Sequence, residues 1–233
     1  MIKNIETFIT DIIGLTPKQP ALYEQAFTHR SYLNEHRQSA LEHNERLEFL
    51  GDAVLELVVT DYLYREYPEK NEGEMTAYRA ALVNTGTLSE TAKTLGLNDY
   101  LRLSKGEAKD TGRARSIILA DTFEALIGAI YLDQGYLIAA DFIAQALFPK
   151  TAEIIAKNLW QDAKSYFQEQ AQEVTGQTPT YRITDEQGPD HNKRFTVGLY
   201  IGEELIATGQ GHSKQEAEQQ AAAAGLIKKA WDK

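Results

Sequence analysis

The 233-residue chain contains no cysteine, which excludes disulfides, thiol nucleophiles and every zinc site built on thiolate ligands. It also lacks any run of about 20 apolar residues, the length that a membrane-spanning helix needs. Glu6 and Asp11 interrupt the apolar pattern of the N-terminus, so we expect no secretory signal there. These absences favour a soluble protein of the reducing cytoplasm without a membrane partner.

Positive charge is scarce as well. The chain has 24 lysines and arginines against 34 acidic residues, a net charge of −10, which on its face argues against a polyanionic partner. Several catalytic signatures are missing: there is no Gly-x-Ser-x-Gly, no His-Glu-x-x-His and no glycine-rich phosphate-binding loop. The 42% of apolar residues is nevertheless enough for a sizeable core, and the length allows one large domain or two modest ones.

The hydrophobic pattern changes about two thirds of the way along the chain. Up to residue 158 apolar residues recur at helical spacing, most clearly over 47–63 and 119–130. After residue 160 an amphipathic helix is followed by three alternating segments and by an Ala-rich helix that a Ser213–Glu216 capping box opens. We therefore predict two domains, an all-α domain over 1–155 and an α+β domain of order α-β-β-β-α over 160–230.

Acidic residues inside apolar helices are the most informative local feature. Glu45, Glu48 and Asp52 are spaced by three and four residues, so a helix places them on one face, and Asp121 and Glu124 repeat this spacing in a second, nearly apolar helix. Unpaired carboxylates are expensive to bury, and a divalent cation would offset that cost. If the two helices face each other, up to five carboxylates converge, and ligation by oxygen alone suits Mg²⁺ or Mn²⁺.

The spacing alone leaves a plainer interpretation open. Acidic residues three or four positions apart are also common on solvated helix faces, and we interpret Glu56, which continues the first stripe, as such a solvated or ion-paired residue. Among catalytic chemistries, metal-assisted hydrolysis of a phosphodiester is the one that the residues support.

The segment 43–52, His-Asn-Glu-Arg-Leu-Glu-Phe-Leu-Gly-Asp, resembles the signature of the ribonuclease III family without a mismatch. Segments 26–32, 72–84 and 119–125 resemble the other motifs of its endonuclease domain, in the same order. The C-terminal α-β-β-β-α segment resembles its double-stranded-RNA-binding domain. The resemblance covers nearly the whole chain, and one domain of each kind is similar to the bacterial form.

The resemblance implies an endoribonuclease that cuts both strands of double-stranded RNA and leaves 5′-phosphate and 3′-hydroxyl ends. It further implies Mg²⁺ as cofactor with Mn²⁺ able to substitute, a homodimer formed through the endonuclease domain, and a role in RNA processing that includes ribosomal RNA precursors and messenger RNA. By matching position, the metal ligands would be Glu48, Asp121 and Glu124, and the catalytic acids would be Glu45, Asp52, Glu72 and Glu124. The resemblance alone assigns Glu72 to this site.

Polar residues of the C-terminal segment suggest how duplex RNA would be bound. Gln168 and Gln172 lie one turn apart and could reach the shallow minor groove, His191 lies in a turn over 188–191, and Lys214 begins the last helix, where phosphate is favoured. A polar helix, an ordinary hairpin loop and an ordinary cap are the plain alternatives.

Two departures from the family predict weaker attraction to phosphate. Residues 159–233 hold eight basic and eleven acidic residues, where an RNA-binding domain usually leans basic, and Gln215 stands where the family usually has a second basic residue. Two rival functions remain: a protein that binds RNA without cutting it, and a metal-dependent phosphohydrolase of small nucleotides that leaves residues 160–230 without a role.

Overall fold

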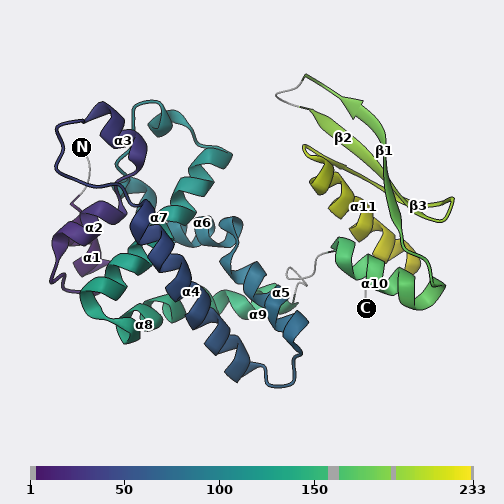
Figure 1. Cartoon of the computed structure of the whole chain (residues 1–233), viewed down its shortest axis with the longest axis horizontal. Coiled ribbons are helices and arrows are strands. Elements are labelled where there is room, and N and C mark those ends of the chain that lie inside the picture. The colour runs from purple at the N-terminus through teal and green to yellow at the C-terminus, as the bar shows by residue number, and fades with distance from the viewer. Residues whose placement is uncertain (1–3, 157–162, 190–192, 232–233) are drawn as a thin grey trace. The chain divides into compact units, whose positions relative to one another are not determined.

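A computed structural model describes residues 4–156, 163–189 and 193–231 of the chain. The chain divides into two compact units, Met1–Trp160 and Gln161–Lys233 (Figure 1). Each unit has a hydrophobic core of its own. The first unit is helical and the second combines helices with a sheet, which confirms the predicted fold class.

Helices make up the first unit and pack around α7, which is buried along most of its length. Gly112 precedes α7, Gly135 separates it from α8, and Pro149 lies in a short 3₁₀ helix after α8. The α-helices are α1 Ile5–Asp11, α2 Pro20–Ala26, α3 Arg30–Glu35, α4 Glu45–Glu66, α5 Glu72–Val83, α6 Thr85–Thr94, α7 Arg113–Gln134, α8 Tyr136–Leu147 and α9 Thr151–Ala156, and the 3₁₀ helices are η1 Leu97–Tyr100, η2 Glu107–Lys109 and η3 Phe148–Lys150.

Helix α4 uses most of its apolar residues inside its own unit. Six apolar side chains between positions 47 and 63 are buried in the core, namely Leu47, Val54, Leu55, Val58, Val59 and Leu63. The apolar residues of 47–63 therefore lie largely in the core and are not available to a partner. What α4 leaves outside is a stripe of three side chains, Phe49, Leu57 and Tyr64, which are 80%, 57% and 71% exposed.

A buried carboxylate fastens the N-terminal segment to the end of α7. Asp133 accepts hydrogen bonds from the N–H groups of Lys18 and Gln19, at 3.1 and 2.7 Å, and from the hydroxyl of Tyr23 at 2.8 Å. Burial opposes ionisation of this carboxyl, but these donors hold the pKa of Asp133 below its usual value. The sequence offered no signal for this role.

The second unit is a three-stranded antiparallel sheet, ordered β1-β2-β3, with helices α10 and α11 packed together and α11 lying against β2 and β3 (Figure 1). Its core contains Phe167, Leu199, Ile206 and Leu226. The elements are α10 Ala163–Thr175, β1 Thr180–Gln187, β2 Arg194–Ile201, β3 Glu204–Gly211 and α11 Lys214–Lys229.

The predicted capping box of α11 forms in part. Ser213 accepts a hydrogen bond from the N–H of Glu216, as predicted, but the Glu216 carboxylate accepts the N–H of His212 rather than that of Ser213. Both side chains of the cap therefore accept a backbone hydrogen bond, but the bond to Glu216 comes from the residue before the one that a capping box uses.

Across the described residues, no helix combines the length and the apolar character that crossing a bilayer requires.

Candidate active site

Two glycines allow α4 and α7 to cross with their backbones in contact. A Cβ atom on Gly51 would lie 1.8 Å from the carbonyl oxygen of Glu124, and a Cβ atom on Gly128 would lie 2.2 Å from that of Leu47. Real side chains do not fit at such distances, so only glycine permits this crossing. The two stretches that carry the acidic residues are brought together as a result.

Three carboxylates meet where the helices cross. Glu48 of α4 and Asp121 and Glu124 of α7 each offer an oxygen, and these oxygens lie within 4.8 Å of one another. All three side chains are half-buried. The two helices therefore face each other, as the convergence of the acids required. Three of the five predicted acids meet at this crossing.

The surroundings of the three carboxyl groups oppose their ionisation. Burial raises the pKa of Glu124 from 4.5 to about 8, assisted by the charges of Asp52, Asp121 and Glu48. Burial likewise raises the pKa of Glu48 to about 7, assisted by Asp121, Glu45 and Asp52. The pKa of Asp121 is also raised, by burial and then by Glu45. Among the described residues no cation contributes to these three pKa values, so the donor set and charge of the carboxylates fit a hard divalent metal ion.

Asp52 and Glu45 lie at the edge of this cluster. Asp52 is exposed one turn beyond Glu48 on α4, and its charge acts on both Glu48 and Glu124. Glu45 is exposed at the start of α4 and pairs with Arg30 at 3.3 Å and with His43 at 3.7 Å. The spacing predicts that up to five carboxylates converge. In the structure three of them form a triad, and Glu45 and Asp52 lie outside it.

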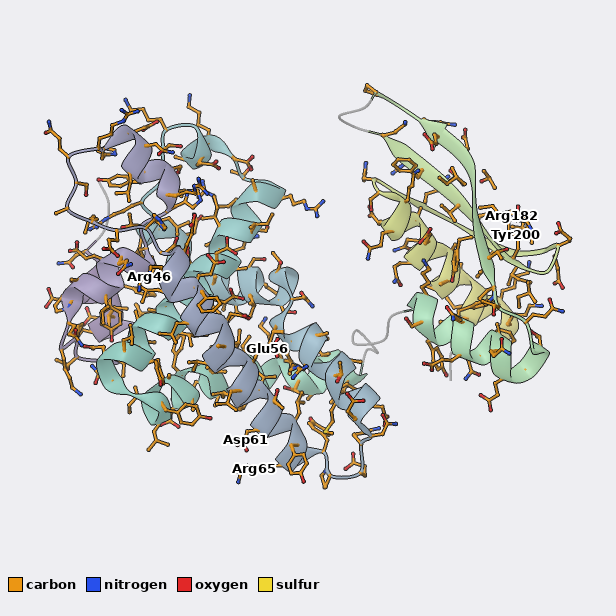
Figure 2. All side chains as sticks on the ribbon, in the orientation of Figure 1. Arg46, Glu56, Asp61, Arg65, Arg182 and Tyr200 are labelled. Carbon is orange, nitrogen blue, oxygen red and sulfur yellow. The ribbon has the colours of Figure 1, made fainter. Side chains whose placement is uncertain are left out.

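Glu72 lies elsewhere in the unit. It is the first residue of α5 and lines a cavity of about 190 Å³ together with Leu63, Tyr64 and Arg79. It is not among the carboxylates that meet at the crossing. Glu56 of α4, labelled in Figure 2, is interpreted from the sequence as solvated or paired. It forms an ion pair with Arg79 at 3.0 Å, which confirms that interpretation.

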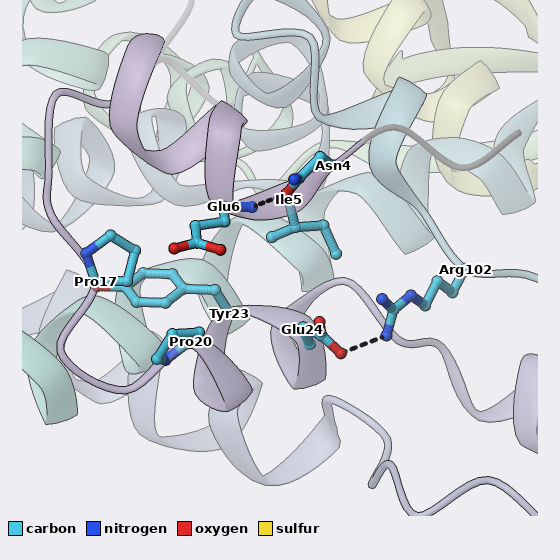
Figure 3. A pocket seen from close by; sticks show the side chains of 8 residues that line it. All are labelled: Asn4, Ile5, Glu6, Pro17, Pro20, Tyr23, Glu24 and Arg102. Atoms are coloured by element: carbon cyan, nitrogen blue, oxygen red, sulfur yellow. Dashed lines mark hydrogen bonds and ion pairs between the residues drawn. The ribbon is translucent and has the colours of Figure 1, made fainter.

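Another cavity, of about 360 Å³, lies beside the N-terminal helices (Figure 3). Its wall includes Tyr23 and the ion pair of Glu24 with Arg102 at 3.2 Å, and Asn4 at its edge caps α1. These groups hold the fold together, and none of the triad acids lines this cavity.

The predicted RNA-binding residues lie in the second unit. Gln168 and Gln172 share an exposed face of α10 and together line a shallow hollow of about 420 Å³. Lys214 is the exposed first residue of α11, as predicted. His191 lies outside the described residues.

Comparisons with known proteins agree with both halves. The model of a family described as ribonuclease-III-like matches residues 19–151, and the model of the double-stranded RNA binding motif matches residues 163–229.

Curated relatives match most of the chain. It is 46% identical over 222 residues to the ribonuclease 3 of Pelotomaculum thermopropionicum, which covers 95% of this chain and 92% of that protein. It is 49% identical over 210 residues to the ribonuclease 3 of Oceanobacillus iheyensis, covering 90% and 92%. A solved structure of the nuclease domain of ribonuclease III from Campylobacter jejuni is 37% identical with a TM-score of 0.55, and covers 63% of this chain and 99% of that one.

The crossing that gathers three acids in a helical unit, the α-β-β-β-α unit after it, and these matches over nearly the full length lead to one conclusion. The chain belongs to the ribonuclease III family of double-strand-specific endoribonucleases.

Proposed function

We propose that Glu48, Asp121 and Glu124 bind Mg²⁺, with Mn²⁺ able to substitute, and that phosphodiester bonds of duplex RNA are hydrolysed at this cluster. The observation that carries the proposal is the meeting of three half-buried carboxylates within 4.8 Å, two of them with a pKa raised to about 7 and 8. Ligation by oxygen alone is the preference of these two ions.

The remaining acids are assigned by position and by resemblance. When bound, the divalent ion polarises the scissile phosphate and lowers the pKa of the attacking water. Asp52, which is exposed beside the triad, and Glu45, which pairs with Arg30, would hold water at the metal or the groups that surround it. Glu72 stays a proposed catalytic residue on resemblance alone. Products would carry 5′-phosphate and 3′-hydroxyl ends.

A homodimer through the endonuclease domain would supply two clusters for the two strands. Phe49, Leu57 and Tyr64 on α4 support this, because they are large apolar side chains that the unit leaves exposed and a partner could cover. Phe49 also borders a cavity of about 630 Å³ that a partner's side chain could fill. The Campylobacter jejuni structure is described as showing flexibility in a region involved in dimer formation.

The second unit would deliver the duplex. Gln168 and Gln172 would reach the minor groove, Lys214 would contact phosphate at the start of α11, and His191 would reach a second groove. On this proposal residues 1–155 form the endonuclease and residues 160–230 the RNA-binding domain of a cytoplasmic enzyme.

Cleavage of a long RNA duplex and of a matched DNA duplex in Mg²⁺ tests the proposal. We expect the RNA to be cut, and Glu124→Gln to abolish cutting while duplex binding persists. Glu90→Gln is the matched control, because Glu90 lies on α6 of the same unit and pairs with Lys150 at 3.3 Å. Cleavage by Glu124→Gln at the parent rate would contradict the assigned site. Binding without any cutting by the parent would favour the non-catalytic rival.

A further inference from the structure

The end of the sheet from which α11 begins brings together four residues, Glu186, Lys193, Phe195 and Lys214. Glu186 of β1 is opposite Phe195 of β2, and Phe195 is in turn opposite Gly211 of β3, which ends two residues before the helix cap Ser213. Lys193 directly precedes β2 and Lys214 is the first residue of α11. Segments distant in sequence therefore share one corner of the domain.

Both lysines are directed to the ring of Phe195. The ammonium nitrogen of Lys193 lies 5.7 Å from the ring centroid and that of Lys214 lies 5.8 Å from it. Cations at this distance over an aromatic face are attracted by its quadrupole. One ring thus restricts two flexible side chains that project from different elements.

An acidic residue forms an ion pair with one of these lysines. Glu186 pairs with Lys193 at 2.9 Å, and both side chains are about one-third exposed. The hydrogen bond from Lys193, followed by the charges of Lys193 and Lys214, lowers the pKa of Glu186, which keeps this acid ionised at neutral pH. Two cations, one anion and the positive end of α11 are therefore concentrated together.

We propose that Phe195 positions Lys193 and Lys214 for RNA phosphate, and that Glu186 competes with phosphate for Lys193 and so lowers the affinity of the enzyme for duplex RNA. The inference rests on the proposed function of the second unit and adds Glu186, Lys193 and Phe195 to its residues. An exposed ion pair is weak enough for a polyanion to open it. The Glu186–Lys193 pair also gives a local reason for the weak phosphate attraction that the sequence predicts in a domain that is acidic on average.

The same sheet contains a matched arrangement at its opposite end. Glu203, in the turn between β2 and β3, binds Arg182 through two hydrogen bonds of 3.2 Å, and the Arg182 guanidinium lies 4.6 Å from the centre of the Tyr200 ring (Figure 2). It is again an acid, a cation and an aromatic ring, but remote along the strands from the start of α11. Glu203→Gln therefore removes the same charge from the same domain without touching the Phe195 corner.

The test measures binding of the full-length chain to a labelled RNA duplex of about 24 base pairs, longer than the roughly 16 that one such domain spans. Chelator replaces the divalent metal so that the duplex stays intact, and each affinity is measured at several salt concentrations. We expect Glu186→Gln to bind about two- to five-fold more tightly than the parent, the range typical of an exposed pair. The slope of log affinity against log salt should steepen by up to about one unit.

Two further variants separate the partners. In a Lys193→Gln background, Glu186→Gln should lose its effect, because the competition has no lysine to act on. Phe195→Leu keeps an apolar side chain but removes the aromatic face, and should weaken binding about two- to five-fold. Circular dichroism of each variant identifies those that fold as the parent does.

The outcomes distinguish the inference from the function on which it rests. Equal tightening by Glu186→Gln and Glu203→Gln would mean that net charge alone acts, and would overturn the inference. The same follows if Glu186→Gln keeps its full effect without Lys193. A parent that fails to bind the duplex at all would overturn the proposed function and this inference together.

Discussion

Among the three acids of the triad, Glu124 has the most strongly raised pKa. Burial and four neighbouring carboxylates raise its pKa to about 8, so the side chain is largely protonated in the metal-free enzyme at neutral pH. A divalent ion must displace that proton to bind, which makes metal affinity rise with pH up to about 8.

The same shift predicts how stability depends on pH without metal. Between pH 4.5 and about 8 the unfolded chain ionises Glu124 while the folded chain keeps it protonated, so unfolding is increasingly favoured as pH rises. We expect Glu124→Gln to remove this loss: in chelator its melting temperature should exceed that of the parent at pH 8, by more than at pH 5. A gain of about 1 kcal/mol corresponds to about 2–4 °C.

Thermal unfolding at the two pH values, with Glu90→Gln as control, checks this prediction. Glu90 is exposed and paired, so its variant should follow the parent at both values. Parallel pH profiles for the parent and for Glu124→Gln would contradict a raised pKa at this position.

At the scale of elements, the crossing of α4 and α7 determines whether the triad exists. The crossing depends on Gly51 and Gly128, because each allows one helix backbone to touch the other. The acidic residues supply the proposed ligands, and the glycines allow the close crossing that brings them together.

Gly128→Ala should therefore destabilise the first unit and weaken metal binding together. Its Cβ atom would lie 2.2 Å from the carbonyl oxygen of Leu47, and a backbone cannot yield as a side chain can. We expect a loss of about 1–3 kcal/mol or more in the free energy of unfolding. Denaturant unfolding and calorimetric titration with Mn²⁺ measure the two effects.

Gly106→Ala is the matched control for this substitution. There the added methyl group would meet only the Ser104 hydroxyl, at 3.8 Å, which is an ordinary contact. If Gly128→Ala keeps parental metal affinity, the crossing does not determine the separation of the ligands.

Helix α11 allows a second prediction at this scale. Gln215 is exposed in the first turn, beside Lys214, so Gln215→Lys would add a cation next to the phosphate that Lys214 is proposed to contact. We expect tighter binding to all duplex sequences and a salt slope steeper by somewhat under one unit, since about one more phosphate is neutralised. Cleavage sites should not move, because phosphate contacts do not read sequence.

Affinity measured over a range of salt tests Gln215→Lys. The lysine would sit unfavourably at a helix N-terminus, at a cost of about 0.3–1 kcal/mol in stability. An unchanged slope would mean that residue 215 does not face the RNA backbone.

At the scale of the whole molecule, the two units have separate cores. Ile154 of α9 is the last buried residue of the first core, and Phe167 of α10 belongs to the second. The triad lies entirely within the first unit.

We therefore expect residues 1–156, which keep α9 whole, to fold, dimerise and cut duplex RNA, but to require more RNA or less salt than the full chain. The physical reason is that all of the proposed metal ligands are kept while the proposed phosphate contacts of the second unit are lost. Cleavage rates over a range of substrate concentrations, with sedimentation for the oligomeric state, measure this. A folded dimer of 1–156 that stays inactive at low salt with Mn²⁺ would show that the second unit does more than deliver substrate.

The sequence by itself determined the helices, the change of pattern near residue 160 and the acidic spacings, because periodicity and side-chain chemistry are local properties. Motif resemblance supplied the family. Only the tertiary structure decided that Glu48, Asp121 and Glu124 meet while Glu72 lies apart in the same chain, because this depends on contacts between segments about 70 residues apart. The sequence contains Gly51 and Gly128, but their role in letting two helix backbones touch depends on the packing of α4 against α7.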